Sequence, residues 1–450
     1  MATERKLFGT DGVRGEAGTF LSAELATALG RAAASSLEVE RPQVLIVRDT
    51  RESGPMLEAA LAAGIAAAGG EALLGGVLPT PAAAILVKRF GFDLAAVVSA
   101  SHNPYRDNGI KFFTAQGVKL DDETEARIES LLGEERGSHF NRIADESSAA
   151  PPEPGRVREL DGGLEDYLRA LEVAFPLDLK GRRVALDCAN GATFRAAPAI
   201  FERLGAEVEL IGAEPDGRNI NAGCGSTHLD LLVDHIVGSD AEIGFAFDGD
   251  GDRVLAVDGS GRVHDGDELI ALAARGIAAR GEPLGGVVVT VMSNYGFHQA
   301  MEEAGIEVAV TQVGDRYVID EMRRRGWGLG GEQSGHIIAS DFVSTGDGIA
   351  AALTTMRELG AAALADAVPM RKLPQTLVNV EVSDREALGG AEAVWAAVER
   401  EEGELEGRGR VLLRPSGTEP LVRVMVEAPS AEEAEAVCDR LVGVVRDELS

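Results

Sequence analysis

Three aspartates stand at alternate positions after one short apolar segment. Asp248, Asp250 and Asp252 occur in FAFDGDGDRV, directly after the strand-like residues IGFAF. In extended backbone such residues point to one side, and the intervening glycines allow a tight wrap. Three carboxylates this close ionise together only around a cation, and oxygen ligands favour Mg²⁺ or Ca²⁺. An EF-hand loop starting at Asp248 fails because Gly259 replaces its twelfth-position Glu; a solvated acidic turn is the remaining alternative.

Ser101 follows a second apolar segment, Leu94 to Val98, in VVSASHNPYRDNG. The Asn-Pro pair after it predicts a loop, and open α/β sheets bind ligands at such strand ends. A serine hydroxyl needs a base or a metal before it can act as a nucleophile. No G-x-S-x-G sequence surrounds Ser101, and His102 should point to the opposite face of an extended segment. A Ser–His pair is therefore not expected.

A phosphorylated Ser101 would need no base, because its phosphate would be the group transferred. One phosphate oxygen could complete the tri-aspartate metal site, and Lys111 and Arg253 would add positive charge beside Mg²⁺. Lys111 is the first candidate for general acid/base catalysis at a sugar oxygen, since the turn NPYRDNG could fold it back toward Ser101. His336 and His102 are the next candidates. The alternative for Lys111 is a surface lysine at the start of the strand IKFF.

A glycine turn near the C-terminus, LLRPSGTEPLVRV, combines guanidinium groups, hydroxyls and free backbone N–H groups. This combination predicts a phosphate-binding loop, with a β-turn flanked by a salt bridge as the alternative. Its candidate ligands are Arg414, Ser416, Gly417, Thr418 and Arg423.

Two further loops carry candidate substrate-binding residues. GGEQSGH places Glu332, Ser334 and His336 at alternate positions after a strand, and a carboxylate and a hydroxyl so spaced suit neighbouring sugar hydroxyls. FGTDGVRG contains Arg14, which could bind an anion or pair with a nearby Asp.

The composition excludes several classes of partner. The chain has 43 Lys and Arg against 74 Asp and Glu, a net charge of −31, which argues against nucleic acid or an anionic membrane. An anionic ligand would need a local cluster of arginines to reverse the sign at its site. Three scattered cysteines without a CxxC indicate neither a disulfide framework nor a zinc site. The N-terminal residues lack the apolar core of a signal peptide, no G-x-x-x-x-G-K-[ST] sequence is present, and we expect a cytoplasmic protein.

Helical Ala/Leu patterns alternate with short Val/Ile segments, which predicts α/β layers. Three times an apolar strand leads into a small polar loop, at AAVVSASHNP, IGFAFDGDGD and WGLGGEQSGH, and this favours three similar domains facing one cleft. The linker-like ESSAAPPEPG and the Pro before TLVNVEV mark breaks, and the last 75 or so residues indicate an α+β domain. The expected domains are 1–153, 154–256, 257–369 and 374–450.

Together these motifs resemble those of the α-D-phosphohexomutases, nearly from end to end. The matching segments are LFGTDGVRG, SASHNPYRDNGIKFF, DGDGDR, CGSTH, VGDRYV, GEQSGH, TGDGI and RPSGTEPLVRV. Val47 stands where the family commonly has glycine before RDTR, but no catalytic role is assigned to this position, so the departure does not argue against activity. GEQSGH in place of the GEMSGH of phosphomannomutase/phosphoglucomutase members favours an amino-sugar substrate.

The resemblance implies a fold of three similar α/β domains with mixed sheets around a central cleft, plus a C-terminal α+β domain with TATA-binding-protein-like topology. It implies that Ser101 is a phosphoserine that binds one Mg²⁺ with the three aspartates. It further implies that Glu332 and Ser334 hold sugar hydroxyls and that the C-terminal loop holds the non-reacting phosphate.

The expected reaction interconverts glucosamine 6-phosphate and glucosamine 1-phosphate through a bisphosphate, in a cytoplasmic monomer or homodimer whose partners are small sugar phosphates. Three alternatives stay open. They are a phosphoglucomutase/phosphomannomutase, a metal-dependent sugar phosphatase, and a non-catalytic sugar-phosphate sensor.

Overall fold

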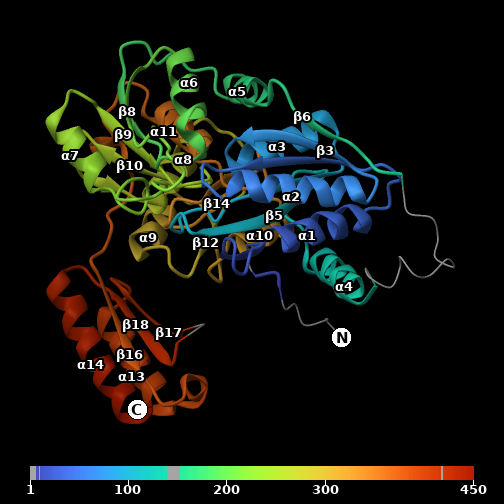
Figure 1. Cartoon of the computed structure of the whole chain (residues 1–450). Helices are drawn as coiled ribbons and strands as arrows, with labels where there is room; N and C mark the ends of the chain where they lie inside the picture. The colour runs from blue at the N-terminus through green and yellow to red at the C-terminus, as the bar shows by residue number, and fades with distance from the viewer. Residues whose placement is uncertain (1–6, 10, 139–152, 417–418, 450) are drawn as a thin grey trace. The chain divides into compact units, whose positions relative to one another are not determined.

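The computed structural model describes residues 7–9, 11–138, 153–416 and 419–449 (Figure 1). The chain forms two compact units, one of Met1–Met292 with Glu307–Val368 and one of Ser293–Ile306 with Pro369–Ser450. Most of the expected linker ESSAAPPEPG lies outside the described residues. The first unit contains three mixed sheets with helices packed on them, and the second contains a smaller antiparallel sheet.

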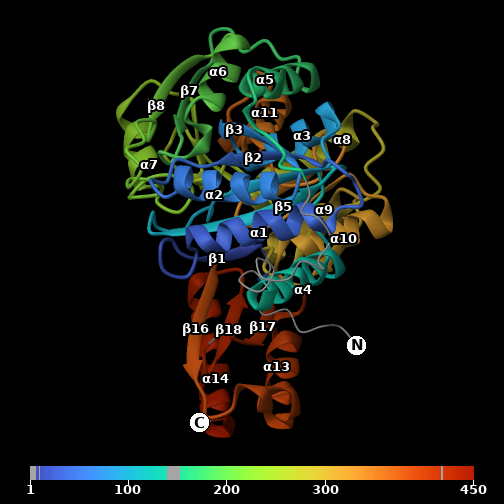
Figure 2. The ribbon, with the colours of Figure 1, turned by 45° about the vertical axis from the view of Figure 1, so that its right-hand side comes forward.

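The first sheet has six strands in the order β1-β5-β4-β2-β3-β6, and β5 alone runs antiparallel to both of its neighbours. Its strands are β1 (Val13–Glu16), β2 (Gln43–Arg48), β3 (Glu71–Val77), β4 (Leu94–Val98), β5 (Asp107–Thr114) and β6 (Val157–Glu159). Its helices are α1 (Ala23–Ser36), α2 (Gly54–Ala67), α3 (Thr80–Phe90) and α4 (Asp122–Ser138). Figures 1 and 2 both show α1 beside α2, where apolar side chains such as Leu29 and Leu61 form a core with Ile46 of β2. Helix α3 instead contacts β2, β4 and α5.

The second and third sheets have the orders β11-β10-β9-β7-β8 and β13-β12-β14-β15. The second contains β7 (Arg183–Asp187), β8 (Glu207–Ile211), β9 (Ile243–Phe247), β10 (Val254–Asp258) and β11 (Val263–His264), with α5 (Gly163–Ala174), η1 (Ala192–Phe194), α6 (Ala196–Arg203) and α7 (Asp230–Gly238). The third contains β12 (Val287–Thr290), β13 (Val308–Thr311), β14 (Leu329–Gly331) and β15 (Ile337–Ala339), with α8 (Gly266–Ala279), α10 (Asp315–Arg325), α11 (Gly348–Leu359) and α12 (Leu364–Ala367).

One strand order recurs in all three sheets. It reads β3-β2-β4-β5 in the first, β8-β7-β9-β10 in the second and β13-β12-β14-β15 in the third, with three parallel strands followed by one antiparallel strand. The loop before the antiparallel strand carries Ser101, the three aspartates or Glu332, respectively. The recurrence expected from the sequence is therefore confirmed, because each candidate loop occupies the same topological position.

The C-terminal part of the second unit is α+β, as expected. Strands β16 (Gln375–Glu381), β17 (Arg410–Pro415) and β18 (Leu421–Glu427) form an antiparallel sheet in the order β16-β18-β17. Valines of this sheet pack against α13 (Glu392–Leu405) and α14 (Ala431–Leu449). A short helix, η2 (Arg385–Gly390), precedes α13 in the chain. The segment of α9 (Tyr295–Glu303) clusters with this unit, and Asn294 and Tyr295 hydrogen-bond to Glu427.

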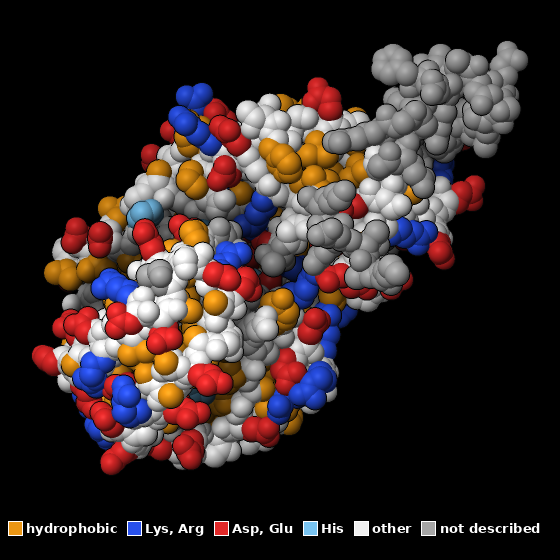
Figure 3. All heavy atoms as spheres, turned by 90° about the horizontal axis from the view of Figure 1, so that it is seen from below, with side chains coloured by type: hydrophobic (Ala, Val, Ile, Leu, Met, Phe, Trp, Pro, Cys, Tyr) orange, Lys and Arg blue, Asp and Glu red, His pale blue; other side chains and the backbone are white. Residues whose placement is uncertain are grey.

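On the face shown in Figure 3, acidic and basic side chains are interspersed and do not separate into patches of one sign. Among the helices of the described residues, none has the length and apolar character that crossing a membrane would take.

Candidate active site

Ser101 lies three residues past β4, in a left-handed conformation with φ of 52°. Its side chain is buried, and its hydroxyl donates a hydrogen bond to Asp248 Oδ2 at 2.6 Å. The same hydroxyl lies 3.2 Å from His102 Nδ1. The expectation that Ser101 and His102 point apart is therefore wrong, because the left-handed turn at Ser101 ends the extended geometry on which it depended.

A buried arginine holds the serine loop in place. The Arg51 guanidinium, which is fully buried, donates to the backbone carbonyls of Ser101 at 2.9 Å, Asn103 at 2.8 Å and Asp107 at 2.9 Å, and also to that of Pro104. An ion pair with Asp49, 2.8 Å long, orients the guanidinium. Five donors in a planar fork suit this role, and a lysine could not reproduce it. Arg51 is thus a positioning residue.

The three aspartates converge, although not through extended backbone. The loop forms a turn in which the Gly251 amide donates to the Asp248 carbonyl at 3.1 Å, and Gly251 has φ of 73°. A Cβ atom at Gly249 would lie 2.5 Å from the Ser101 carbonyl oxygen, so only glycine lets the two loops approach this closely. The expected convergence is confirmed, and its route is a glycine turn.

The residues present fit a divalent cation. Carboxylate oxygens of Asp248, Asp250 and Asp252 lie within 4.8 Å of one another, and all three side chains are buried. Asp250 Oδ1 and Asp252 Oδ1 are buried without a hydrogen-bond partner among the described residues. Burial raises the pKa of Asp248 well above its usual value, and the negative charges of Asp252 and Asp250 raise it further. Buried carboxylates crowded in this way are the expected setting of a metal ion.

Lys111 is buried beside this cluster and is not a surface lysine. It lies on β5 opposite Val97 of β4, with 3% of its side chain exposed. Its Nζ donates to Asp250 Oδ2 at 2.8 Å and lies 3.6 Å from Asp252. Burial lowers the pKa of Lys111, but Asp11, Asp250 and Asp252 outweigh burial and raise it. The side chain is therefore a protonated ammonium.

Two other candidates for acid/base chemistry, His336 and His102, lie near the aspartate group, as does Arg253. His336 is buried, with Nδ1 3.7 Å from Asp252, and its Nε2 accepts from the Gly346 amide at 3.1 Å. The guanidinium of Arg253 lies 3.8 Å from Asp252 Oδ1. Burial lowers the pKa of His102, and the nearby guanidinium groups of Arg253 and Arg14 lower it further.

These groups border a cavity of about 590 Å³ in the first unit. Glu332 and Ser334, the predicted sugar ligands, line it together with Arg14, which forms an ion pair with Asp11. The arginine cluster expected for an anionic ligand is not found in this cavity, because its two arginines stand among four carboxylates. The charged lining residues are Asp11, Arg14, Asp252, Arg253, Asp315 and Glu332.

The C-terminal loop belongs to the second unit. Arg414 lies on β17, Ser416 follows it and Arg423 lies on β18, whereas Gly417 and Thr418 fall outside the described residues. Arg385 donates to the carbonyl oxygens of Ser416 at 2.7 Å and Glu419 at 3.2 Å, which supports the loop from η2.

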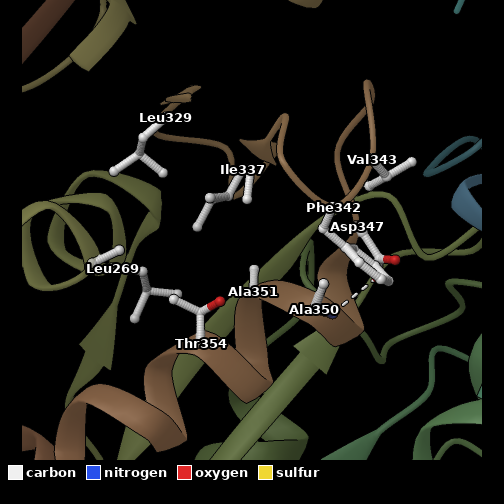
Figure 4. A pocket seen from close by; sticks show the side chains of 11 residues that line it. Leu269, Leu329, Ile337, Phe342, Val343, Asp347, Ala350, Ala351 and Thr354 are labelled. Carbon is white, nitrogen blue, oxygen red and sulfur yellow. Dashed lines mark hydrogen bonds between the residues drawn. The ribbon is translucent and has the colours of Figure 1, made fainter. Parts of the chain in front are cut away.

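A separate small cavity in the first unit, about 20 Å³, is apolar apart from Asp347 and Thr354 (Figure 4). The Asp347 carboxylate caps α11 by accepting from the Ala350 amide at 2.9 Å, and the Tyr167 hydroxyl donates to it at 3.0 Å. Burial raises the pKa of Asp347 to about 7.

Several residues that shape the site have no role that the sequence alone predicts. Asn221, which donates to the Ser101 carbonyl at 2.9 Å, lies in a loop remote in sequence, and no local pattern marks it. Asp11 and Asp315 belong to the motifs FGTDGVRG and VGDRYV, which the resemblance to the family marks. The spacing of the residues in these motifs does not by itself predict a metal site, a catalytic group or a binding site.

Comparison with known proteins accounts for nearly the whole chain. The family models for phosphoglucomutase/phosphomannomutase domains I, II, III and the C-terminal domain match residues 5–138, 165–261, 265–371 and 377–444. The phosphoglucosamine mutase of Moorella thermoacetica is 50% identical over 96% of this chain and 97% of its own, and that of Staphylococcus carnosus is 44% identical over 99% of each.

Solved structures agree on the fold. A phosphoglucomutase/phosphomannomutase family protein from Burkholderia thailandensis has a TM-score of 0.81 at 24% identity, over 98% of this chain and 97% of its own. An N-acetylphosphoglucosamine mutase from Aspergillus fumigatus, solved with GlcNAc-6P and magnesium, has a TM-score of 0.68 at 18% identity, over 99% and 96%. With four family models in order and full-length relatives at 44–50% identity, the chain belongs to the phosphoglucomutase/phosphomannomutase family of phosphohexomutases.

Proposed function

We infer that this protein interconverts glucosamine 6-phosphate and glucosamine 1-phosphate. One observation carries the chemistry: the Ser101 hydroxyl contacts Asp248 within a buried group of three aspartates that Lys111 adjoins. The choice of the amino sugar is supported by the full-length relatives, which are phosphoglucosamine mutases.

We assign Ser101 as the phosphorylated residue. It gives its phosphate to the free hydroxyl of the sugar phosphate, which forms a bisphosphate, and it takes back the phosphate at the other end after the intermediate turns over. Asp248, Asp250, Asp252 and the phosphate on Ser101 would hold one Mg²⁺. When bound, this ion would offset negative charge on the phosphoryl group.

Protons must move at two oxygens in this cycle. His102 contacts Ser101 Oγ, so we assign it to this oxygen: the neutral imidazole takes the Ser101 proton when Ser101 recovers a phosphate, and returns it when the phosphate leaves again. We assign Lys111 to the sugar oxygen, with His336 as the second candidate, because both lie beside Asp252 in the same cluster. The ammonium gives a proton to the sugar oxygen that loses its phosphate to Ser101, and the amine so formed takes the proton of the next sugar hydroxyl that is phosphorylated. Arg253 would stabilise the charge of the transferring phosphoryl group.

Binding the sugar phosphate in two orientations requires groups that recognise both ends. We assign Glu332 and Ser334 to the sugar hydroxyls and Arg14 to the anion in the cavity. The non-reacting phosphate would bind the C-terminal loop through Arg414, Ser416, Gly417, Thr418 and Arg423. One such loop must accept the phosphate at either end, since the intermediate turns over between the two transfers.

A mutase assay across glucosamine, glucose, mannose and N-acetylglucosamine phosphates tests the proposal. We expect the highest kcat/KM for glucosamine phosphate, with no release of inorganic phosphate. Release of phosphate would indicate a phosphatase, and preference for glucose or mannose phosphate would make the protein a phosphoglucomutase/phosphomannomutase. Intact mass should show a phosphate adduct that Ser101→Ala abolishes together with activity, and full activity of that variant would overturn the assignment.

A further inference from the structure

Lys119 is a largely covered lysine between β5 and α4 that has no part in the steps above. Its backbone forms an isolated antiparallel bridge with Phe113 of β5, after a turn at Gly117 where φ is 73°. Only 10% of its side chain is exposed. A lysine is buried to this degree only when its charge is paired.

Two carboxylates pair with this ammonium. Lys119 Nζ donates to Asp11 Oδ1 at 2.5 Å and also to Asp315 Oδ2. Burial lowers the pKa of Lys119, but Asp11 and Asp315 outweigh burial and raise it, so the group stays charged. Asp11 comes from the N-terminal loop and Asp315 from the first turn of α10, so Lys119 joins two segments that are distant in sequence.

Both carboxylates line the 590 Å³ cavity, whereas Lys119 lines a neighbouring cavity of about 460 Å³ that shares Asp315 with it. Asp11 forms an ion pair with Arg14, the proposed anion-binding residue. The Gly314 amide, next to Asp315, donates to Glu332 Oε1 at 3.1 Å. Through its two partners, Lys119 is therefore connected to both proposed substrate-binding walls.

Lys119 also completes a ring of acidic and basic groups around the site. Lys111 lies 3.9 Å from Asp11 and 3.6 Å from Asp252. His336 lies 3.7 Å from Asp252 and 3.8 Å from Asp315. The two ion pairs of Lys119 close the ring, in which basic and acidic groups alternate in the order Lys111, Asp11, Lys119, Asp315, His336 and Asp252. Without Lys119, Asp11 and Asp315 would lose the cation they share.

We propose that Lys119 is a positioning residue for sugar-phosphate binding, which keeps the Arg14 loop and the Glu332 loop at the spacing that the substrate requires. This inference rests on the proposed function. It assigns Lys119 no contact with substrate, since the ammonium acts through Asp11 and Asp315.

The test compares Lys119→Met with Arg316→Met in the full-length protein. Arg316, the residue after Asp315, joins α10 to the segment just after Lys119, donating to the Leu120 carbonyl at 3.0 Å and to Glu125 at 3.1 Å, but it does not line the 590 Å³ cavity. We expect Lys119→Met to raise KM for glucosamine 6-phosphate at least tenfold and to lower kcat by a smaller factor. Arg316→Met should lower Tm while KM stays within twofold of wild type. Lys119→Arg, which keeps the positive charge, should have a KM closer to that of wild type than Lys119→Met has.

Unchanged KM in a folded Lys119→Met protein would overturn the proposal, as would equal KM changes in the Lys119 and Arg316 variants. If Lys119→Met does not fold, Lys119→Gln replaces it, since an amide can still donate to one carboxylate. Failure of both neutral variants to fold, while Arg316→Met folds, would make the ammonium structural and also overturn the proposal. The wild-type assay separates the two hypotheses, because a wild-type protein without mutase activity would refute the proposed function and leave Lys119 without a reaction to serve.

Discussion

Arg414 of β17 and Arg423 of β18 lie directly opposite each other in the antiparallel sheet. Like charges at opposed positions destabilise a sheet, and neither guanidinium has a hydrogen-bond or ion-pair partner among the described residues. Burial lowers the pKa of Arg414, and the positive charge of Arg423 lowers it further. Two guanidinium groups at opposed positions, without a partner in the described part of the chain, are suited to bind an anion such as phosphate.

Arg414→Ala should raise KM for the sugar phosphate at least tenfold, because it removes a charge-assisted contact present in both the ground and the transition state. We expect kcat to fall as well, since a loosely held phosphate misplaces the reacting hydroxyl. Steady-state kinetics measures both. Arg408→Ala is the control, since Arg408 is an exposed residue of the same unit that pairs with Glu433, and its removal should leave KM unchanged. An unchanged KM in Arg414→Ala would place the phosphate-binding site elsewhere.

Removal of divalent metal should abolish activity, and Mg²⁺ should restore it. Mg²⁺ should also raise the Tm of the metal-free protein, because a ligand that binds only the folded state stabilises it. Asp250→Asn removes one ligand charge at nearly constant volume, so the Tm response to Mg²⁺ should shrink. Asp240→Asn, at an exposed acid paired with Arg183, is the control and should respond like wild type. Normal turnover in chelator-treated protein would make the aspartate group structural.

Lys111→Met should lower kcat by roughly 10²–10⁴-fold, the usual span for general acid–base catalysis, while the Ser101 phosphate persists. The methionine retains the length and apolar stem of the lysine and removes only the ammonium. Intact mass measures the phosphate on Ser101, and single-turnover kinetics measures the rate of its transfer separately. A kcat within about threefold of wild type would contradict the role and shift it to His336.

The sequence predicted the loops of the site better than their internal geometry. Short apolar strands followed by Gly, Asp and Asn identify loops at strand ends, which is why Ser101, the aspartates and Glu332 could be found. The contact between Ser101 and His102 could not, because it depends on a left-handed φ at a serine, a conformation that local sequence does not favour. The turn of the aspartate loop was likewise set by a distant contact, the carbonyl of Ser101 against Gly249.

Buried charge was the feature least accessible from sequence. From the sequence, Lys111 can equally be a surface residue, and no pattern marks Lys119 or Arg51, since each is paired by carboxylates or carbonyls from remote segments. Charged residues are usually exposed, so only tertiary structure reveals the exceptions. The roles of the site residues remain predictions that the variants above test, and the four domain boundaries remain predictions as well.

The Asp347 carboxyl should make stability depend on pH between about 4 and 7. Burial raises its pKa in the folded protein from 3.8 to about 7, so across this interval the folded state binds a proton that the unfolded state has released. Stability contributed by this group is therefore present at low pH and is lost as pH rises toward 7. At 1.36 kcal/mol per pKa unit, the loss of unfolding free energy is at most about 4 kcal/mol.

Asp347→Asn keeps an oxygen that can accept from the Ala350 amide and an amide group that can contact Tyr167, but it does not titrate. Denaturant unfolding of wild type and Asp347→Asn at several pH values should give a difference in unfolding free energy that shifts in favour of the variant from pH 4 to pH 7, and a constant difference would contradict the assignment.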